Sequence, residues 1–199
     1  MSRSSTRRST SRNTSRSTAR RKKNNTGTYI GIGVVALILV VAIGFAIYRS
    51  ASRNVGERIA DMGVSLHLAN PEDVPPVPYN SNPPTSGYHW GGGTAPWGIL
   101  NEPVPDTLTV HNIEHGGVII HYREGLEQAT VDQLTEVARD LLRRNPCVVM
   151  LPRPADQIDT PIVLTAWNYL MRLETVDRES IEAFFNAYIG RGPEPVCRP

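Results

Sequence analysis

Five histidines are the residues of this 199-residue sequence best suited to chemistry, and all of them fall within one short stretch. Imidazole nitrogens bind zinc and copper, so a local excess of histidine predicts a site for one of these ions. The alternative is that each ring satisfies buried backbone groups where a loop meets a sheet. The five residues are His67, His89, His111, His115 and His121.

Residues His111 to His115 read His-x-x-Glu-His, the pattern with which one class of zinc proteases binds its metal. That pattern works on a helix, where residues four apart share a face. Strand-like residues precede it here and Gly116-Gly117 follow it, so we expect at most one helical turn. One turn still suffices to bring His111 and His115 together, although a protease is not favoured.

The predicted metal ligands are His111 and His115 with His89 as a third nitrogen, and His67 or His121 as a fourth. Glu114 is expected to orient an imidazole from behind the ligands, as carboxylates commonly do. Three nitrogens with an open position would permit metal-assisted hydrolysis. No residue is assigned a catalytic role, because no nucleophile, phosphate-binding or dinucleotide motif occurs.

Two cysteines, Cys147 and Cys197, are predicted to form a disulfide. A pair of cysteines in a small domain outside the cytoplasm usually does so. The alternative is a thiolate metal ligand, but neither cysteine lies in a Cys-x-x-Cys or Cys-x-His cluster.

A proline-rich stretch, residues 70–106, should form a long extended loop, since proline fixes φ and removes a backbone donor. A loop of this length in a compact domain is either disordered or functional. Its aromatic residues favour order. The glycines Gly116 and Gly117 indicate either a turn or a close approach, and the polar segment 79–87 is the expected neighbour.

The pattern of the remaining sequence predicts an α+β domain, in which two helices pack on one face of a small mixed sheet. Expected strands are 107–110, 118–122, 147–151 and 161–167. A helix should follow a capping box at 130–133 and end near residue 145. A second helix should begin after Asp177 and end at Gly190. Residues 49–66 are expected to form a linker with a short helix from residue 54.

An uncharged apolar stretch, residues 29–48, is long enough to cross a bilayer as a helix. A cleaved signal peptide is the alternative. Residues 1–53 contain eleven Lys and Arg and no acidic residue, whereas residues 54–199 contain ten Arg and nineteen acidic residues. By the positive-inside rule, the basic tail 1–28 should be cytoplasmic and disordered, and residues 67–199 should form an extracytoplasmic domain at the cell membrane.

The motifs of this chain resemble those of the bacterial domain-of-unknown-function family 3105. The resemblance covers residues 55 to 195 and implies an N-terminal anchor with an outward domain, without an assigned activity. Its motif histidines correspond to His89, His111 and His115, and to His67, whereas His121 lies outside the pattern. A Cys-Gly-x-Tyr stretch of many relatives is missing near Trp97. The motif loop comprises Asn82, Pro83, Pro84, Thr85, Ser86, Gly87, Gly116 and Gly117.

Three functions follow as hypotheses. The first is a metal-binding domain for copper or zinc, and the second is an interaction module that contacts another membrane or envelope protein through the aromatic loop. The third is a metal-dependent hydrolase. The lipid membrane is the expected partner, and nucleic acid is not, because the basic tail lacks aromatic residues that stack on bases.

Overall fold

The computed structural model describes residues 35, 37–44 and 55–197. The chain divides into two units, Met1–Phe45 and Ala46–Pro199, which are described separately. The predicted tail 1–28, most of the predicted span 29–48 and the first part of the linker 49–66 lie outside the described residues.

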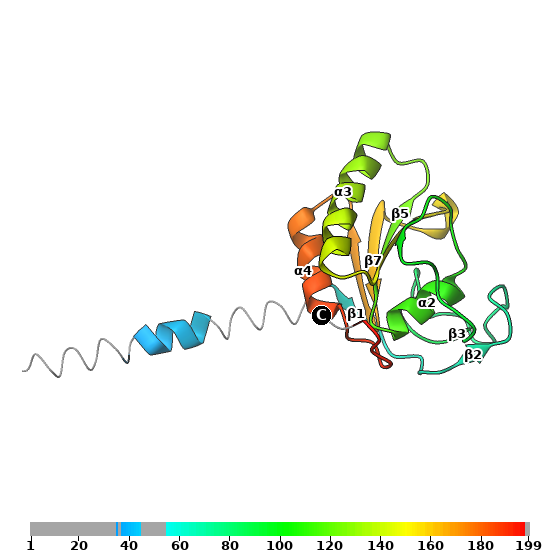
Figure 1. The fold of residues 1–199 in the computed structure, drawn as a ribbon, viewed down its shortest axis with the longest axis horizontal. Helices are drawn as coiled ribbons and strands as arrows, with labels where there is room; N and C mark the ends of the chain where they lie inside the picture. Colours follow the sequence, from blue (N-terminus) through cyan, green and yellow to red (C-terminus); the bar gives the residue numbers. More distant parts are fainter. Residues whose placement is uncertain (1–34, 36, 45–54, 198–199) are drawn as a thin grey trace, which may run out of the picture. The chain divides into compact units, whose positions relative to one another are not determined.

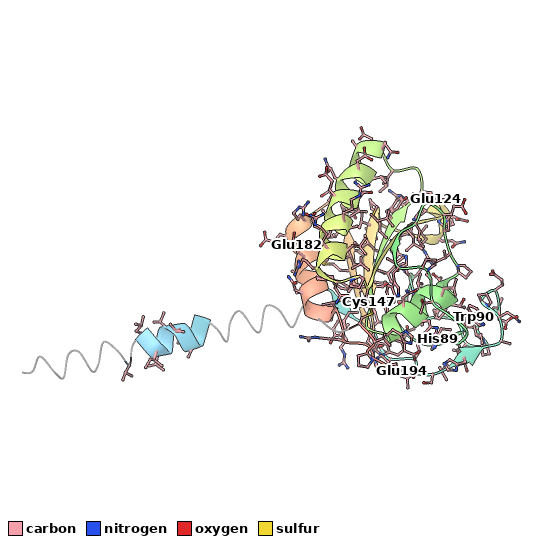
Figure 2. The ribbon with its side chains drawn as sticks, viewed as in Figure 1. His89, Trp90, Glu124, Cys147, Glu182 and Glu194 are labelled. Atoms are coloured by element: carbon pink, nitrogen blue, oxygen red, sulfur yellow. A yellow bond between two sulfur atoms is a disulfide. The ribbon has the colours of Figure 1, made fainter. Side chains whose placement is uncertain are left out.

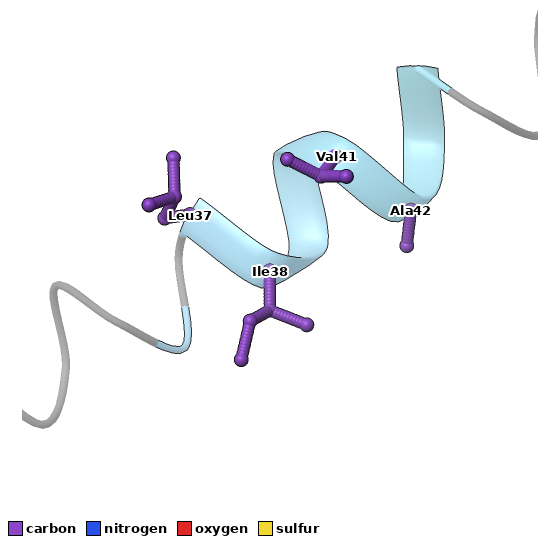
Figure 3. A pocket seen from close by; sticks show the side chains of 4 residues that line it. All are labelled: Leu37, Ile38, Val41 and Ala42. Atoms are coloured by element: carbon purple, nitrogen blue, oxygen red, sulfur yellow. The ribbon is translucent and has the colours of Figure 1, made fainter.

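Residues 37–44 of the first unit are helical, and their large apolar side chains are exposed. Figure 3 shows one face of this helix, formed by Leu37, Ile38, Val41 and Ala42. Among the described residues, no helix combines the length and the apolar character needed to cross a membrane.

The second unit is built on a six-stranded mixed sheet with the strand order β1-β8-β7-β5-β6-β4. Strands β4, β6 and β5 are parallel to one another, and β5, β7, β8 and β1 pair antiparallel. A separate pair of short strands, β2 and β3, is parallel. The strand bounds are β1 Glu57–Arg58, β2 His67–Leu68, β3 His89–Trp90, β4 Gly98–Ile99, β5 Val118–Arg123, β6 Val148–Arg153, β7 Ile162–Ala166 and β8 Tyr169–Leu173.

Two helices, α3 (Gln128–Arg144) and α4 (Arg178–Tyr188), cover one face of the sheet (Figure 1). Their apolar stripes pack with Val118, Ile120 and Met150 in the larger hydrophobic core. Helix α3 connects the parallel strands β5 and β6, so this part is a β-α-β unit, for which a crossover helix is the usual solution.

The opposite face is covered by helix α2 (Asp106–Glu114) and the proline-rich loop. Val110 and Ile113 of α2 pack there against Ile119, Val149 and Leu151 of the sheet. Every residue of β6 and β7 is therefore buried, as expected for strands covered on both faces. The prediction of helices on a single face is wrong, because it overlooked α2.

Four local predictions are wrong. Residues 107–110 belong to helix α2 and are not a strand. No helix lies within 55–66; Glu57 and Arg58 form an edge strand instead. Strand β8 was missed, and α3 begins at Gln128 without a side-chain cap, so the capping box at 130–133 does not form.

Several local predictions within the described residues are confirmed. Strands β5, β6 and β7 lie where expected, and Asp177 accepts a hydrogen bond from the Ser180 backbone N–H at the start of α4. A disulfide joins Cys147 to Cys197. Residues Ala155–Gln157 form a short 3-10 helix.

Candidate metal centre

The pairing of β2 with β3 brings two of the histidines together. In this parallel pair His67 lies directly opposite His89, and the ring centroids are 5.0 Å apart. The backbone N–H of His89 donates to the carbonyl of Leu66 at 2.9 Å. The ring of His89 is fully buried, whereas His67 is exposed.

Helix α2 supplies the third group, because its last residue, Glu114, points at His89. The Oε2 atom of Glu114 lies 2.8 Å from Nε2 of His89, and both side chains are fully buried. The other carboxylate oxygen, Oε1, accepts a hydrogen bond from the backbone N–H of Ser65 at 2.8 Å. The carboxylate is therefore fixed from one side and left free on the side that faces the imidazole.

The hydrogen bond at Nδ1 of His89 shows which ring nitrogen carries the proton. Nδ1 lies 2.9 Å from the carbonyl oxygen of Gly87, which only accepts, so Nδ1 carries the hydrogen. In the neutral ring Nε2 then presents a lone pair to the carboxylate of Glu114. Burial lowers the pKa of His89, against the opposing effects of the Gly87 hydrogen bond and the Glu114 charge.

The space between His89 and Glu114 is buried and holds one close polar contact. Nε2 of His89 and Oε2 of Glu114 lie 2.8 Å apart as an imidazole–carboxylate pair, and within the described part of the chain neither atom has another hydrogen-bond partner. Buried polar atoms are nearly always paired, because leaving one unpaired costs about 1–3 kcal/mol. A proton or a metal cation between the two atoms would remove this cost.

His111 and His115 extend the cluster along α2. The ring of His111 lies 5.0 Å from that of His89 and 4.5 Å from that of His115, between centroids. Nδ1 of His111 donates to the carbonyl of Gly93 at 2.9 Å, which fixes the orientation of the ring. Desolvation, followed by the charge of His111, lowers the pKa of the partly exposed His115.

The compact donor set differs from the predicted one. His67, His89 and Glu114 each offer one donor atom, and these atoms lie within 4.8 Å of one another. His111 and His115 continue the row of rings without joining that set. Glu114, expected behind the ligands, stands among the donors. His121 is buried in β5 against Thr165 and takes no part.

Most of the motif loop is buried, and it holds His89 in place. Ser86 accepts the backbone N–H of Met62, the carbonyl of Thr85 accepts the N–H of Asn168, and Gly87 orients the His89 ring. Asn82 accepts a hydrogen bond from Arg153 at 2.9 Å. Pro83 and Pro84 are buried between these anchors. The loop is a scaffold for the site.

Gly116 and Gly117 form a turn at the end of α2 that other segments approach closely. Gly116 has a φ of +86°, and a Cβ on it would meet the backbone of Gly190 at 2.9 Å. A Cβ on Gly117 would meet the ring of Trp97 at 2.6 Å. The segment that crosses here is therefore the C-terminal one, together with Trp97, and not the expected segment 79–87.

Three supporting features were not anticipated. Asn112 holds the loop at Ala95 through two hydrogen bonds, one in each direction. Ser65 anchors Glu114. Gly91 leaves room for the ring of His67, whose atoms would lie 2.8–3.0 Å from a Cβ at that position. The only signal in the sequence for the role of Gly91 was the run of glycines that follows His89-Trp90.

The donor set suits a borderline transition metal. Two imidazoles and one carboxylate are a common ligand set of catalytic zinc sites, with bonds of about 2.0–2.2 Å. Tetrahedral bonds of that length place donor atoms roughly 3.3 Å apart. The separations observed here, from 2.8 to 4.8 Å, bracket that value, so small side-chain movements would close the set around an ion.

Comparison with known proteins agrees with the motif resemblance. No curated protein matches this chain, and no solved structure matches it. The model of a family described as "Protein of unknown function (DUF3105)" matches residues 72–198. That range contains His89, His111, Glu114 and His115, and it begins after His67. Because the match spans more than half of the chain, the protein belongs to the DUF3105 family.

Proposed function

We propose that this protein binds one divalent transition-metal ion, zinc or copper, through His67, His89 and Glu114. The observation that supports the proposal is the buried contact between Nε2 of His89 and Oε2 of Glu114, which lie 2.8 Å apart and have no other hydrogen-bond partner among the described residues. A cation held between these atoms would make a coordinate bond to each of them. Neutral imidazole and carboxylate are the protonation states that metal binding requires.

The chemistry of the donors favours the divalent ions over Cu⁺. Imidazole suits zinc and Cu²⁺, whereas Cu⁺ prefers thiolate and thioether sulfur. Both cysteines are joined to each other and supply no thiolate. The exposed ring of His67 gives the ion a way in from solvent, and the carbonyl of Gly87 supports the ligand His89 from behind.

We also propose that the apolar segment 29–48 anchors the domain outside the cytoplasm. Three features support this placement. The segment is long and uncharged, its N-terminal flank is strongly basic, and the domain contains a disulfide, which persists in oxidising compartments. A metal site held there would meet ions from outside the cell or from the periplasm.

Elemental analysis of the purified full chain tests the metal proposal. The protein is kept in mild detergent, incubated with a slight excess of Zn²⁺ or, separately, Cu²⁺, and desalted before measurement. We expect one ion per chain. His89→Ala and Glu114→Gln should each lose most of it, because each variant removes a buried donor.

His115→Ala is the matched control, since this histidine directly follows helix α2 but lies outside the compact donor set. It should keep the ion. If His115→Ala loses as much bound metal as His89→Ala, the ion binds farther along the row of imidazoles than proposed. A wild-type chain that stays metal-free under both loadings would refute the proposal.

A further inference from the structure

The last described residues, 190–197, form a strap that crosses the end of helix α2. Four backbone hydrogen bonds hold it there. The N–H of Gly190 donates to Gly116, that of Glu194 donates to Glu114, and those of Val196 and Cys197 both donate to His115, at 2.8 to 3.1 Å. The acceptors are carbonyls at or just beyond the end of α2, which no residue within the helix can satisfy.

The strap has little else to hold it. Its residues 191 and 193–196 are exposed, Val196 to 69%, and the one fully buried side chain is Cys197 at 2%. That cysteine is joined to Cys147, which directly precedes β6 in the sheet. The disulfide is therefore the main link between the strap and the core of the domain.

The strap also touches the metal donors. Glu194 accepts a hydrogen bond from the hydroxyl of Ser65 at 2.9 Å, and the backbone N–H of the same serine holds Oε1 of Glu114. Gly192 lies directly on the backbone carbonyl of Glu114, where a Cβ would clash. Figure 2 labels His89, Cys147 and Glu194, which lie at the end of the domain that carries α2.

We propose that the Cys147–Cys197 disulfide positions Glu114 for metal binding, so that its redox state sets the affinity of the site. This inference rests on the proposed function. With the disulfide formed, the strap fixes both the backbone and, through Ser65, the carboxylate of Glu114. When the bond is reduced, the four backbone hydrogen bonds remain, and Glu114 loses its fixed direction toward His89.

The redox step needs a dithiol reductant. One thiolate of the reductant attacks the sulfur of the partly exposed Cys147, and Cys197 leaves as a thiolate that takes up a proton. The second thiol of the reductant then displaces Cys147 from the mixed disulfide. The reductant ends as a disulfide, and two electrons and two protons pass to the pair of cysteines.

The test measures the affinity of the full chain for Zn²⁺ by competition with a chromogenic chelator. The Cys147→Ser, Cys197→Ser double variant mimics the reduced state without adding a thiol reagent, which would itself bind the metal. We expect its dissociation constant to rise at least tenfold, within the 10- to 100-fold range typical of residues that orient metal ligands.

A second variant, Gly192→Ala, lifts the strap while leaving both cysteines bonded, and it should weaken Zn²⁺ binding in the same direction. Leu134→Ala is the control, because it opens a cavity in α3 on the opposite face of the sheet. Circular dichroism confirms that each variant is folded at the temperature used. Leu134→Ala should bind as the wild type does, even though it lowers the melting temperature.

The outcomes separate the two proposals. If the wild type binds Zn²⁺ and both strap variants bind it equally well, the redox inference is overturned and the metal site stands. If Leu134→Ala weakens binding as much as the strap variants, the effect follows general stability, and the inference is again overturned. If the wild type shows no affinity for Zn²⁺, the proposed function itself is refuted.

Discussion

Glu114 is the one carboxylate of the compact donor set. It ends α2, it is fully buried, and its Oε2 lies 2.8 Å from Nε2 of His89. Among the described residues no Lys or Arg is paired with it, so the group between Glu114 and His89 is a proton or an ion. This residue therefore decides how the domain behaves with and without metal.

Glu114→Gln should have opposite effects in the two states. In the metal-free protein the amide of glutamine can donate to Nε2 of His89, while its oxygen still accepts from Ser65. We expect the free energy of unfolding to rise by about 0.5–1.5 kcal/mol, the net value of one hydrogen bond. Thermal unfolding without and with Zn²⁺ measures this; the wild type should gain stability from Zn²⁺ and the variant should not. A metal-free variant less stable than wild type would contradict the assignment of facing acceptors.

His121 provides a second prediction at the residue scale. It is buried in β5, its Nε2 lies 3.2 Å from the hydroxyl of Thr165, and its Nδ1 has no hydrogen-bond partner in the part of the chain that the structure describes. Burial, and secondarily the charge of Arg153, holds its pKa well below the usual value of 6.5. The folded state therefore keeps this ring neutral while the unfolded state binds a proton.

The stability contributed by the neutral ring is present above pH 6.5 and is lost as the pH falls below that value. The slope is at most about 1.4 kcal/mol per pH unit for one group. Urea unfolding at several pH values between 7 and 5 should show a weaker pH dependence for His121→Gln than for the wild type. Identical slopes would mean that His121 does not carry this dependence.

At the scale of the elements, helix α2 and the strand pair β2–β3 assemble the site. Residues 107–110 of helix α2 were predicted as a strand, and three of them, Thr107, Thr109 and Val110, are β-branched. Intrinsic propensity is a weak guide where burial decides the outcome. Seven of the nine residues of this helix are buried, and Asp106 in its first turn is paired with the guanidinium of Arg153.

The turn after β3 sets the position of His67. Gly91→Ala would push a methyl group into ring atoms that lie within 3.0 Å of it. We expect the ring to move away from His89 and the dissociation constant for Zn²⁺ to rise about tenfold. Chelator competition measures the change.

A double-mutant cycle identifies the cause of that change. If Gly91→Ala acts through the ring, adding it to His67→Ala should weaken binding no further. Additive losses would show that the turn affects the site by another route.

At the scale of the whole molecule, one face of the sheet carries the larger hydrophobic core, and the other face carries the candidate metal donors. Helices α3 and α4 complete the larger core on one side. On the other side α2, the motif loop and the strap gather the donors at one end of the domain (Figure 1). Each of these three segments contributes backbone hydrogen bonds that fix a donor or its neighbour.

The proposed orientation in the membrane is tested on the whole chain. A reporter that is active only outside the cytoplasm, fused after Pro199, should be active. A fusion of the same reporter before residue 29 should be inactive, since the basic flank is expected to stay inside. The reverse pattern would invert the topology, and release of the fusion from membranes would favour a cleaved signal peptide.

Sequence alone determined the features that depend on neighbours along the chain. Amphipathic spacing identified α3 and α4, apolar runs identified β5, β6 and β7, and the two cysteines identified the disulfide. The residue types of the candidate site were also visible, because histidines and a glutamate in one short stretch predict binding of a metal of the zinc or copper kind.

Tertiary structure decided which of those residues meet. His67 and His89 are 22 positions apart and become neighbours only through the register of β2 on β3. Glu114 joins them because α2 packs against β3 and because Ser65, 49 positions away, holds one of its oxygens. These contacts depend on hydrogen bonds and packing between distant segments, whose free energy no local pattern records. The sequence therefore identified the candidate histidines, and the fold brought two of them together with Glu114.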